Sequence, residues 1–258
     1  MSKRLDISDI LRSYPRERPP LTPRHRACYV EEYLRNRAGS GPLTSVKMKL
    51  ESWTHLQVAR VQRDGPVLEL GAGTLNHLAF EPSSSEYDVV EPFESLWRDS
   101  PHIHRVRRLY AAIDEAPTAR AYARIFSIAV LEHLTDLPVV VAMCGLRLQP
   151  DGIFQAGIPT EAGFLWGAAW RTTTGPAYRL RTGLPYAAIM RHEHVNSASE
   201  IARVLKYFFE RVLTRRFPLP YYHASFYTYL EASGPRLDRC EAFRLARTES
   251  VESPPKDA

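Results

Sequence analysis

The sequence predicts an α/β domain whose central sheet is mostly parallel and has helices on both faces. Short apolar runs of strand length alternate with longer segments of helical periodicity, and the first run ends directly in a glycine turn. The runs expected to form strands are 67–70, 87–91, 106–110, 124–129, 153–157, 212–217 and 225–230. Polar and apolar residues alternate in the last run, which favours a half-buried antiparallel pair for the last two strands.

The segments between the expected strands carry helix signals. Apolar side chains recur at helical spacing in 23–37 and 44–62, ahead of the first strand. Further helices are expected at 93–99 and 137–148. A last helix should follow the capping-box sequence Ser197–Glu200, which an apolar stripe continues.

These signals divide the chain of 258 residues into four parts. Residues 1–24 form an Arg- and Pro-rich arm, expected to be extended over the surface or mobile because proline removes backbone donors. Residues 25–62 form an N-terminal helical cap, and 63–232 form the main domain. Within it, 159–196 interrupts the alternation and is predicted to be a substrate lid. Residues 233–258 are a polar C-terminal tail, expected to fray.

Composition excludes several classes of protein. The balance of 34 Lys+Arg against 29 Asp+Glu gives a net charge of +5, which is weak support for a nucleic-acid partner, and none is expected. No run of about 18 apolar residues predicts a membrane span, and no secretory signal is recognised. Cys28, Cys144 and Cys240 are odd in number and far apart, so we expect neither disulfides nor zinc, and a cytoplasmic location. The oligomeric state stays open.

The strongest local signal is the run 67–70, which leads into Gly71-Ala72-Gly73. Glycines at such a turn let a ligand approach the main chain. The third glycine of the dinucleotide fingerprint is missing, since Asn76 stands in its place. Glu91 lies 20 residues after Gly71, at the end of the next strand, where a carboxylate accepts hydrogen bonds from ribose hydroxyls. The pattern therefore favours a nucleoside without pyrophosphate.

Four segments together resemble the class I S-adenosylmethionine-dependent methyltransferases. They are Glu-Leu-Gly-Ala-Gly-Thr at 69–74, Asp-Val-Val-Glu-Pro at 88–92, Ser-Ile-Ala-Val-Leu-Glu-His-Leu at 127–134, and Leu-Gln-Pro-Asp-Gly-Ile-Phe-Gln-Ala-Gly at 148–157. The likeness covers about residues 50–232 in the order and spacing of that family. It implies a Rossmann-like sheet of seven strands, S-adenosyl-L-methionine as cofactor, and S-adenosyl-L-homocysteine as product.

The resemblance also implies residue roles. Glu69 would face the methionine amino group, and Glu91 would hold the ribose. Asn76 would contact the cofactor or cap the first helix. The remaining cofactor-binding residues implied are Gly71, Ala72 and Gly73 under the methionine part, Pro92 beside the ribose, Asp114 at the adenine amine, and Ala129 and Val130 on the methionine side.

Methyl transfer to a hydroxyl needs a group that removes a proton, and histidine suits neutral pH. His194 is the predicted base, with Asn196 nearby for the substrate. His133, just beyond the fourth strand, is a second candidate, for which a structural or cofactor-side role is an open alternative. The run His192-Glu193-His194 would place both histidines on one strand face, but no third ligand is apparent, so no metal is predicted.

The lid composition bears on the acceptor. Trp166, Trp170 and Tyr178 offer flat faces for sugar or aromatic rings. Arg179 and Arg181 could pair with a phosphate or carboxylate of an anionic acceptor, the alternative being a solvated basic surface. Arg171, Arg191 and Tyr186 extend the same pattern.

The sequence thus predicts methyl transfer to a small-molecule or glycan-type acceptor at a hydroxyl, in surface-polysaccharide or secondary-metabolite biosynthesis. The alternatives are an N- or C-methyltransferase of another metabolite and a catalytically silent cofactor-binding partner. A nucleic-acid or protein methyltransferase is not expected, because Ala129-Val130-Leu131-Glu132 replaces the Asn/Asp-Pro-Pro-Phe/Tyr motif after the fourth strand.

Overall fold

A computed structural model describes residues 6–29, 42–82 and 86–252. Its centre is one sheet of seven strands in the order β3-β2-β1-β4-β5-β7-β6. The strands are β1 (Val67–Leu70), β2 (Tyr87–Val90), β3 (Val106–Tyr110), β4 (Tyr122–Ile128), β5 (Leu148–Pro159), β6 (Phe209–Pro218) and β7 (Ser225–Pro235). All seven predicted strands are present, and β5, β6 and β7 are longer than their apolar cores indicated.

The sheet is parallel except for one strand. β1 pairs in parallel with β2 and β4, while β7 runs antiparallel to both β5 and β6. Leu70, the last residue of β1, pairs with Val90 on one side and Ser127 on the other. The carboxyl ends of the three central strands therefore meet at one edge. The mostly parallel Rossmann-like sheet is confirmed.

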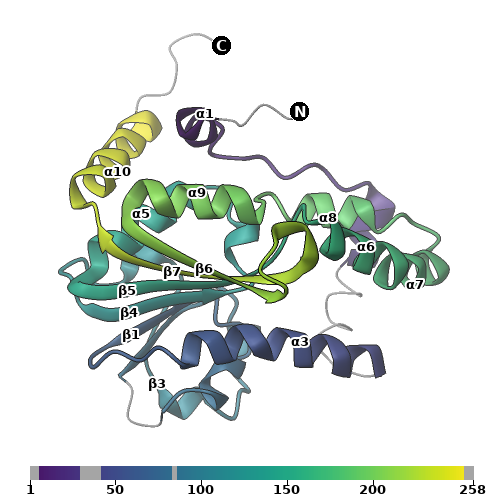
Figure 1. The fold of residues 1–258 in the computed structure, drawn as a ribbon, viewed down its shortest axis with the longest axis horizontal. Helices are drawn as coiled ribbons and strands as arrows, with labels where there is room; N and C mark the ends of the chain where they lie inside the picture. Colours follow the sequence, from purple (N-terminus) through teal and green to yellow (C-terminus); the bar gives the residue numbers. More distant parts are fainter. Residues whose placement is uncertain (1–5, 30–41, 83–85, 253–258) are drawn as a thin grey trace.

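Helices cover both faces, as predicted (Figure 1). α5 (Leu137–Arg147) and α9 (Ala198–Phe208) lie on one face, and α3 (Pro42–Ala59) crosses the other. Successive strand residues point to opposite faces. Leu68 accordingly joins the core under α5 and α9, and Val67 joins the core that includes Val58 of α3.

The helices largely follow the sequence pattern. α9 begins with the predicted capping box. The Ser197 side chain accepts a hydrogen bond from the Glu200 backbone N–H, and the Glu200 side chain accepts one from the Ser197 backbone N–H. The helix expected at 93–99 is the single turn α4 (Glu94–Trp97). Of the helix expected at 23–37, residues 23–29 are helical and the rest lies outside the described residues. After the glycine turn, only the short 3-10 helix η1 (Asn76–Ala79) forms.

The lid consists of three short helices beyond one end of the sheet (Figure 1). They are α6 (Phe164–Thr172), α7 (Thr174–Thr182) and α8 (Ala187–Glu193). Their insertion between β5 and α9 is where the sequence predicted it.

The expectation of a frayed segment after Pro235 is wrong for 237–252. This segment forms α10 (Leu237–Glu252), which packs against α5. Cys240 is fully buried and lies against Gly145 of α5, and Phe243 packs on the main core. Cys240 and Phe243 anchor the helix, and Arg247 adds an ion pair with Asp136. Most of its other side chains are polar, which explains why the composition resembled a tail.

The N-terminal arm is packed on the protein rather than mobile. It begins with α1 (Ile7–Arg12), which the prolines did not predict and which Asp6 caps by accepting from the backbone of Ile7 at 2.7 Å. Ile10 is buried in the main core. Beyond Arg12 the arm is extended and crosses to the lid, where Leu21 packs against Tyr178 (Figure 1). Across the described ranges, no helix has the length and apolar character that crossing a bilayer requires.

Candidate functional site

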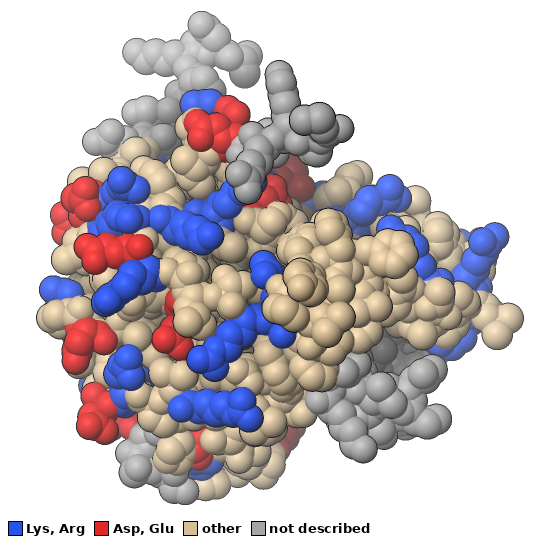
Figure 2. Space-filling model, in the orientation of Figure 1, with Lys and Arg blue, Asp and Glu red and all other residues tan. Residues whose placement is uncertain are grey.

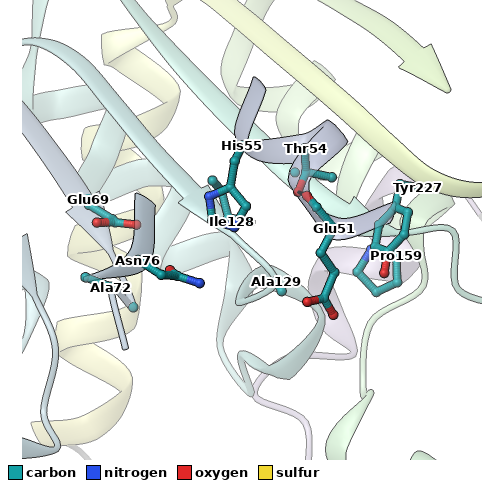
Figure 3. A pocket seen from close by; sticks show the side chains of 12 residues that line it. Glu51, Thr54, His55, Glu69, Ala72, Asn76, Ile128, Ala129, Pro159 and Tyr227 are labelled. Atoms are coloured by element: carbon teal, nitrogen blue, oxygen red, sulfur yellow. Dashed lines mark hydrogen bonds between the residues drawn. The ribbon is translucent and has the colours of Figure 1, made fainter. Parts of the chain in front are cut away.

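A cavity of about 130 Å³ lies at the edge of the sheet where β1 and β4 end. Figure 3 shows Glu69, Ala72 and Asn76 at one end of it, Glu51, Pro159 and Tyr227 at the other, and His55 between them. The described residues that line it are Glu51, Thr54, His55, Glu69, Gly71, Ala72, Asn76, Ile128, Ala129, Gly157, Pro159 and Tyr227. Five predicted cofactor residues are thus brought together: Glu69, Gly71, Ala72, Asn76 and Ala129.

The glycine turn forms one wall of the cavity, and its geometry requires glycine. Gly71 has a φ of +66°, and a Cβ there would lie 2.4 Å from a methyl group of Val130. Gly73 also has a positive φ, of 54°. Glycine at position 71 therefore lets the turn pack against Val130 while its main chain lines the cavity.

Glu69, the residue before the last of β1, is a buried carboxyl group with a fixed partner. Its side chain accepts a hydrogen bond of 2.6 Å from the Tyr87 hydroxyl. Burial raises the pKa of Glu69, against the opposing effects of His77 and the Tyr87 hydrogen bond. A carboxylate so deprived of water attracts a cationic group that reaches it.

Glu91 follows β2 and holds the turn in place. One carboxylate oxygen accepts from the Gly73 backbone at 2.9 Å and the other from the Phe93 backbone at 3.1 Å. Each oxygen keeps a second lone pair, so the side chain retains the capacity to accept two hydroxyl groups. Pro92 and Phe93, which follow, are exposed, Phe93 at 62%.

Helix α3 forms the opposite wall and approaches the sheet closely. A Cβ on Gly157 of β5 would lie 2.8 Å from Cβ of Thr54. Absence of a side chain at 157 therefore allows Thr54 and His55 of α3 to reach the cavity. His55 is joined through its Nδ1 to Nδ1 of His77 at 2.9 Å.

The far end of the cavity faces the lid. Tyr227 of β7 is 6% exposed, and its ring meets Trp166 of α6 edge-on at 5.8 Å between centroids. Burial raises the pKa of Tyr227, as do the nearby carboxylates Glu51 and Glu132. The Tyr227 hydroxyl therefore stays protonated and can donate a hydrogen bond.

Neither His133 nor His194 is among the described residues that line this cavity. Their rings contact each other edge-on at 4.8 Å between centroids, at the base of the lid. His194 Nδ1 is hydrogen-bonded to Glu161, and His133 Nδ1 donates to the Glu193 carbonyl at 2.8 Å.

His194 does not favour the neutral imidazole form that a general base requires. Burial lowers its pKa, but the hydrogen bond to Glu161 and the charges of Glu161, Glu132 and Glu193 outweigh burial, so the pKa of His194 is raised. His194 therefore favours the imidazolium form in an ion pair. The run from His192 to His194 is also not a strand face, because it ends α8, and His192 turns to the Pro19 carbonyl instead.

Asn196 has a structural role that differs from the predicted contact with the acceptor. Its amide nitrogen donates to the carbonyls of Leu131 and Leu134 at 2.8 and 2.7 Å. Its oxygen accepts from Tyr14 at 2.6 Å and from Arg16 at 3.2 Å. The side chain is 1% exposed, and all four of its hydrogen-bonding positions are used.

The predicted lid residues divide between two places. Trp166 contacts Tyr227, which lines the cavity. Trp170 and Arg179 line a separate, wider groove of about 410 Å³ on the lid. Tyr178 is buried in the contact between lid and arm. Figure 2 shows one face of the molecule, on which acidic side chains lie mainly over the sheet and basic side chains lie over both the sheet and the lid. The four lid arginines Arg171, Arg179, Arg181 and Arg191 are exposed and are not among the described residues that line the cavity at the glycine turn.

The predicted cofactor residues that do not line the cavity are Gly73, Glu91, Pro92, Val130 and Asp114. Gly73, Glu91 and Val130 belong to the glycine turn or contact it. Asp114 has a different position. It lies in η3 (Ile113–Glu115) with an exposed side chain and is not among the described residues around the cavity. Four residues that line the cavity were not predicted as site residues: Glu51, Thr54, His55 and Tyr227. Their signal was available in part, since polar residues at positions i, i+3 and i+4 share one face of the predicted helix.

The strand order, the single antiparallel strand and the site at the carboxyl ends of β1 and β4 define the fold of the class I S-adenosylmethionine-dependent methyltransferases. An O-methyltransferase family protein from Burkholderia thailandensis superposes with a TM-score of 0.55 and 14% identity, over 88% of this chain and 67% of that chain. A SAM-dependent methyltransferase of Thermotoga maritima, a possible histamine N-methyltransferase, gives 0.52 and 14%, over 81% and 96%. Phosphoethanolamine N-methyltransferase 2 of Haemonchus contortus, in complex with S-adenosyl-L-methionine, gives 0.51 and 11%, over 72% and 52%. No protein-family model and no curated protein sequence matches the chain.

Proposed function

We propose that this protein transfers a methyl group from S-adenosyl-L-methionine to a hydroxyl of a small-molecule acceptor. One observation carries the proposal. The cavity joins the glycine turn to the buried Glu69, and the turn itself is held by Glu91. This set fits a nucleoside with an amino-acid end, because the main chain at Gly71 and Ala72 lines the cavity beside a buried carboxyl group that can hold an amino group.

The cofactor would supply a methyl group already activated on a sulfonium. Glu69 and Asn76 are placed for its amino-acid end, and Glu91 for its ribose hydroxyls. The cavity of about 130 Å³ is smaller than the roughly 300–1,000 Å³ of typical ligand pockets. We therefore assign the cavity to the amino-acid end and place the adenosine along Glu91 and the exposed ring of Phe93.

The acceptor would approach from the end formed by Glu51, Pro159 and Tyr227 (Figure 3). Tyr227 is suited to donate a hydrogen bond to the acceptor oxygen, and Glu51 to take the proton that this oxygen loses. His194 is less suited to that role, because its ion pair with Glu161 favours the protonated form.

An amine acceptor is a second candidate. Glu51 and Glu69 make the cavity acidic, and no Lys or Arg appears among its described lining residues. Such a cavity favours a cationic or neutral acceptor. An anionic acceptor would need the lid arginines, which lie on the outer surface and around the lid groove.

Two measurements test the proposal. Calorimetry should show micromolar binding of S-adenosylhomocysteine and no comparable binding of NAD; tight NAD binding would contradict it. Release of S-adenosylhomocysteine should then be followed with acceptors that carry hydroxyl or amine groups. Binding without turnover on any acceptor would favour the catalytically silent cofactor-binding protein.

A further inference from the structure

A chain of buried polar side chains connects the middle of the sheet with the cavity. Arg124 of β4 has no exposed surface and forms an ion pair with Glu81. Glu81 Oε1 lies 2.7 Å from His77 Nε2, and His77 Nδ1 lies 2.9 Å from Nδ1 of His55. His55 lines the cavity. Because burial of charged groups is costly, so long a chain calls for a function beyond packing.

The partners set the direction of each hydrogen bond. Burial opposes ionisation of Glu81, but hydrogen bonds from His77 and Arg124 outweigh it and lower its pKa. Ionised Glu81 accepts, so His77 donates from Nε2. Arg124 already balances the charge of Glu81, so one proton on His77, donated from Nε2, completes the chain.

Neutral His77 presents a lone pair at Nδ1, and the short contact there requires His55 to donate its own Nδ1 proton. Burial, with the neighbouring His77, lowers the pKa of His55 to about 3, so its ring carries one proton only. That proton is used toward His77. The second ring nitrogen, Nε2, is then a bare hydrogen-bond acceptor.

We propose that the chain Arg124–Glu81–His77 fixes His55 in its Nδ1-protonated form, so that Nε2 accepts a hydrogen bond from the ammonium group of the cofactor's amino-acid end. This inference rests on the proposed function. His55 lies between Glu69 and Glu51 in the cavity (Figure 3), where two carboxyl groups and a lone pair surround a space of suitable size for an ammonium. His77, Glu81 and Arg124 act only through His55 and are positioning residues.

Calorimetry with two ligands tests the contact. S-adenosylhomocysteine carries the ammonium group, whereas 5′-methylthioadenosine keeps the adenosine and sulfur without the amino-acid end. His55→Phe retains a flat ring that can stack on His77 and Phe80. It should weaken S-adenosylhomocysteine about tenfold and change methylthioadenosine less than about twofold. The matched control is His25→Phe, a buried histidine that contacts the Pro185 carbonyl of the lid, which should change neither affinity.

Two outcomes of that experiment would overturn the inference. If the S-adenosylhomocysteine affinity of His55→Phe is unchanged, His55 does not contact the cofactor. This outcome would also be found if His55 bound an amine of the acceptor instead. An equal loss for both ligands would mean a general defect of the site. If the unmodified protein binds neither ligand, the proposed function itself fails.

Nitrogen-15 NMR of the histidine rings tests the tautomer without any ligand. The His55 signals of the unmodified protein, assigned by their absence in His55→Phe, should show a proton on Nδ1 and none on Nε2. A proton on Nε2, or on both nitrogens, would overturn the inference. His77→Phe should shift His55 toward the Nε2-protonated form and weaken S-adenosylhomocysteine in parallel. Where that variant does not fold, the spectrum of the unmodified protein decides.

Discussion

His194 and Glu161 are hydrogen-bonded across the base of the lid, although 33 residues separate them in the chain. Glu161 follows β5 and His194 follows α8, so all three lid helices lie between them. The Tyr222 hydroxyl also donates to the Glu161 carbonyl. The pair therefore closes the insertion as a loop on the sheet, and its charge state affects how firmly the lid is held.

We expect this pair to stabilise the protein more at low pH. The pKa of His194 is raised in the folded protein, so its contribution is complete below the unfolded value of about 6.5 and is lost as pH rises through the folded pKa. His194→Gln should lower the unfolding free energy by roughly 1–3 kcal/mol at pH 6 and by less at pH 9. Urea unfolding across this range checks it, with exposed His223→Gln as control. A difference that grows with pH would contradict the ion pair.

Gly71→Ala should damage both folding and cofactor binding. The new Cβ would lie 2.4 Å from Val130 in a backbone region with positive φ, which we expect to lower the unfolding free energy by roughly 1–3 kcal/mol. Adding Val130→Ala should relieve the steric part and leave the backbone strain. If the double variant regains the full unfolding free energy, the positive φ at position 71 contributes nothing to the loss. Thermal unfolding and calorimetry with S-adenosylhomocysteine measure the two effects.

Glu91→Ala should weaken S-adenosylhomocysteine roughly ten- to hundredfold, equivalent to about 1.5–3 kcal/mol, because the ribose hydroxyls lose their acceptor. The Gly73 and Phe93 backbone groups lose theirs as well, so the melting temperature should also fall. Glu94→Ala is the matched control, since Glu94 is exposed and pairs with Arg98. Unaltered affinity in Glu91→Ala would show that the ribose lies elsewhere.

Glu51→Gln and Tyr227→Phe should lower turnover and spare cofactor affinity. If Glu51 takes the acceptor proton, its loss should reduce turnover roughly a hundredfold. Tyr227→Phe keeps the ring contact with Trp166 and removes only the hydroxyl. S-adenosylhomocysteine release gives the rates, and calorimetry should show affinities within about twofold of the unmodified protein. A large loss of affinity would place Glu51 on the cofactor side.

Asn196→Ala should lower stability by roughly 2–4 kcal/mol, because two carbonyls and the Tyr14 hydroxyl lose their partner in a buried site. Tyr14→Phe removes one of these bonds and should lower it by about 1 kcal/mol. The double variant should lose less than the sum, since the two changes share one bond. Denaturant unfolding measures all three; strict additivity would mean that the bond contributes nothing.

Much of the fold was readable from the sequence because its signals are local. The strands β1, β2 and β4 are mainly apolar, buried runs of strand length, and the sequence Gly71-Ala72-Gly73 itself indicates the turn that follows β1. The capping box at Ser197 needs only neighbours three residues apart. Each of these was predicted from a few adjacent side chains.

The parts that were missed depend on distant contacts. α10 is ordered through Cys240 and Phe243, whose partners on α5 and in the core no local pattern reveals. The structural role of Asn196 depends on Tyr14, 182 residues away. His55 became a site residue only because Gly157 lets α3 lie close to β5. The sequence shows which residue types are present, but it does not show which of these distant residues contact each other in the fold.

The contacts of the arm also bear on how the protein is made. Arg16 and Arg18 bind Glu200 and Glu193, residues that leave the ribosome long after the arm itself. Arg16 and Arg18 also contact the Thr135 and His133 carbonyls, which are made earlier, but the arm gains its two acidic partners only when the chain has been translated beyond Glu200. Docking of the arm would then be a late event, one that joins the first residues made to the finished lid.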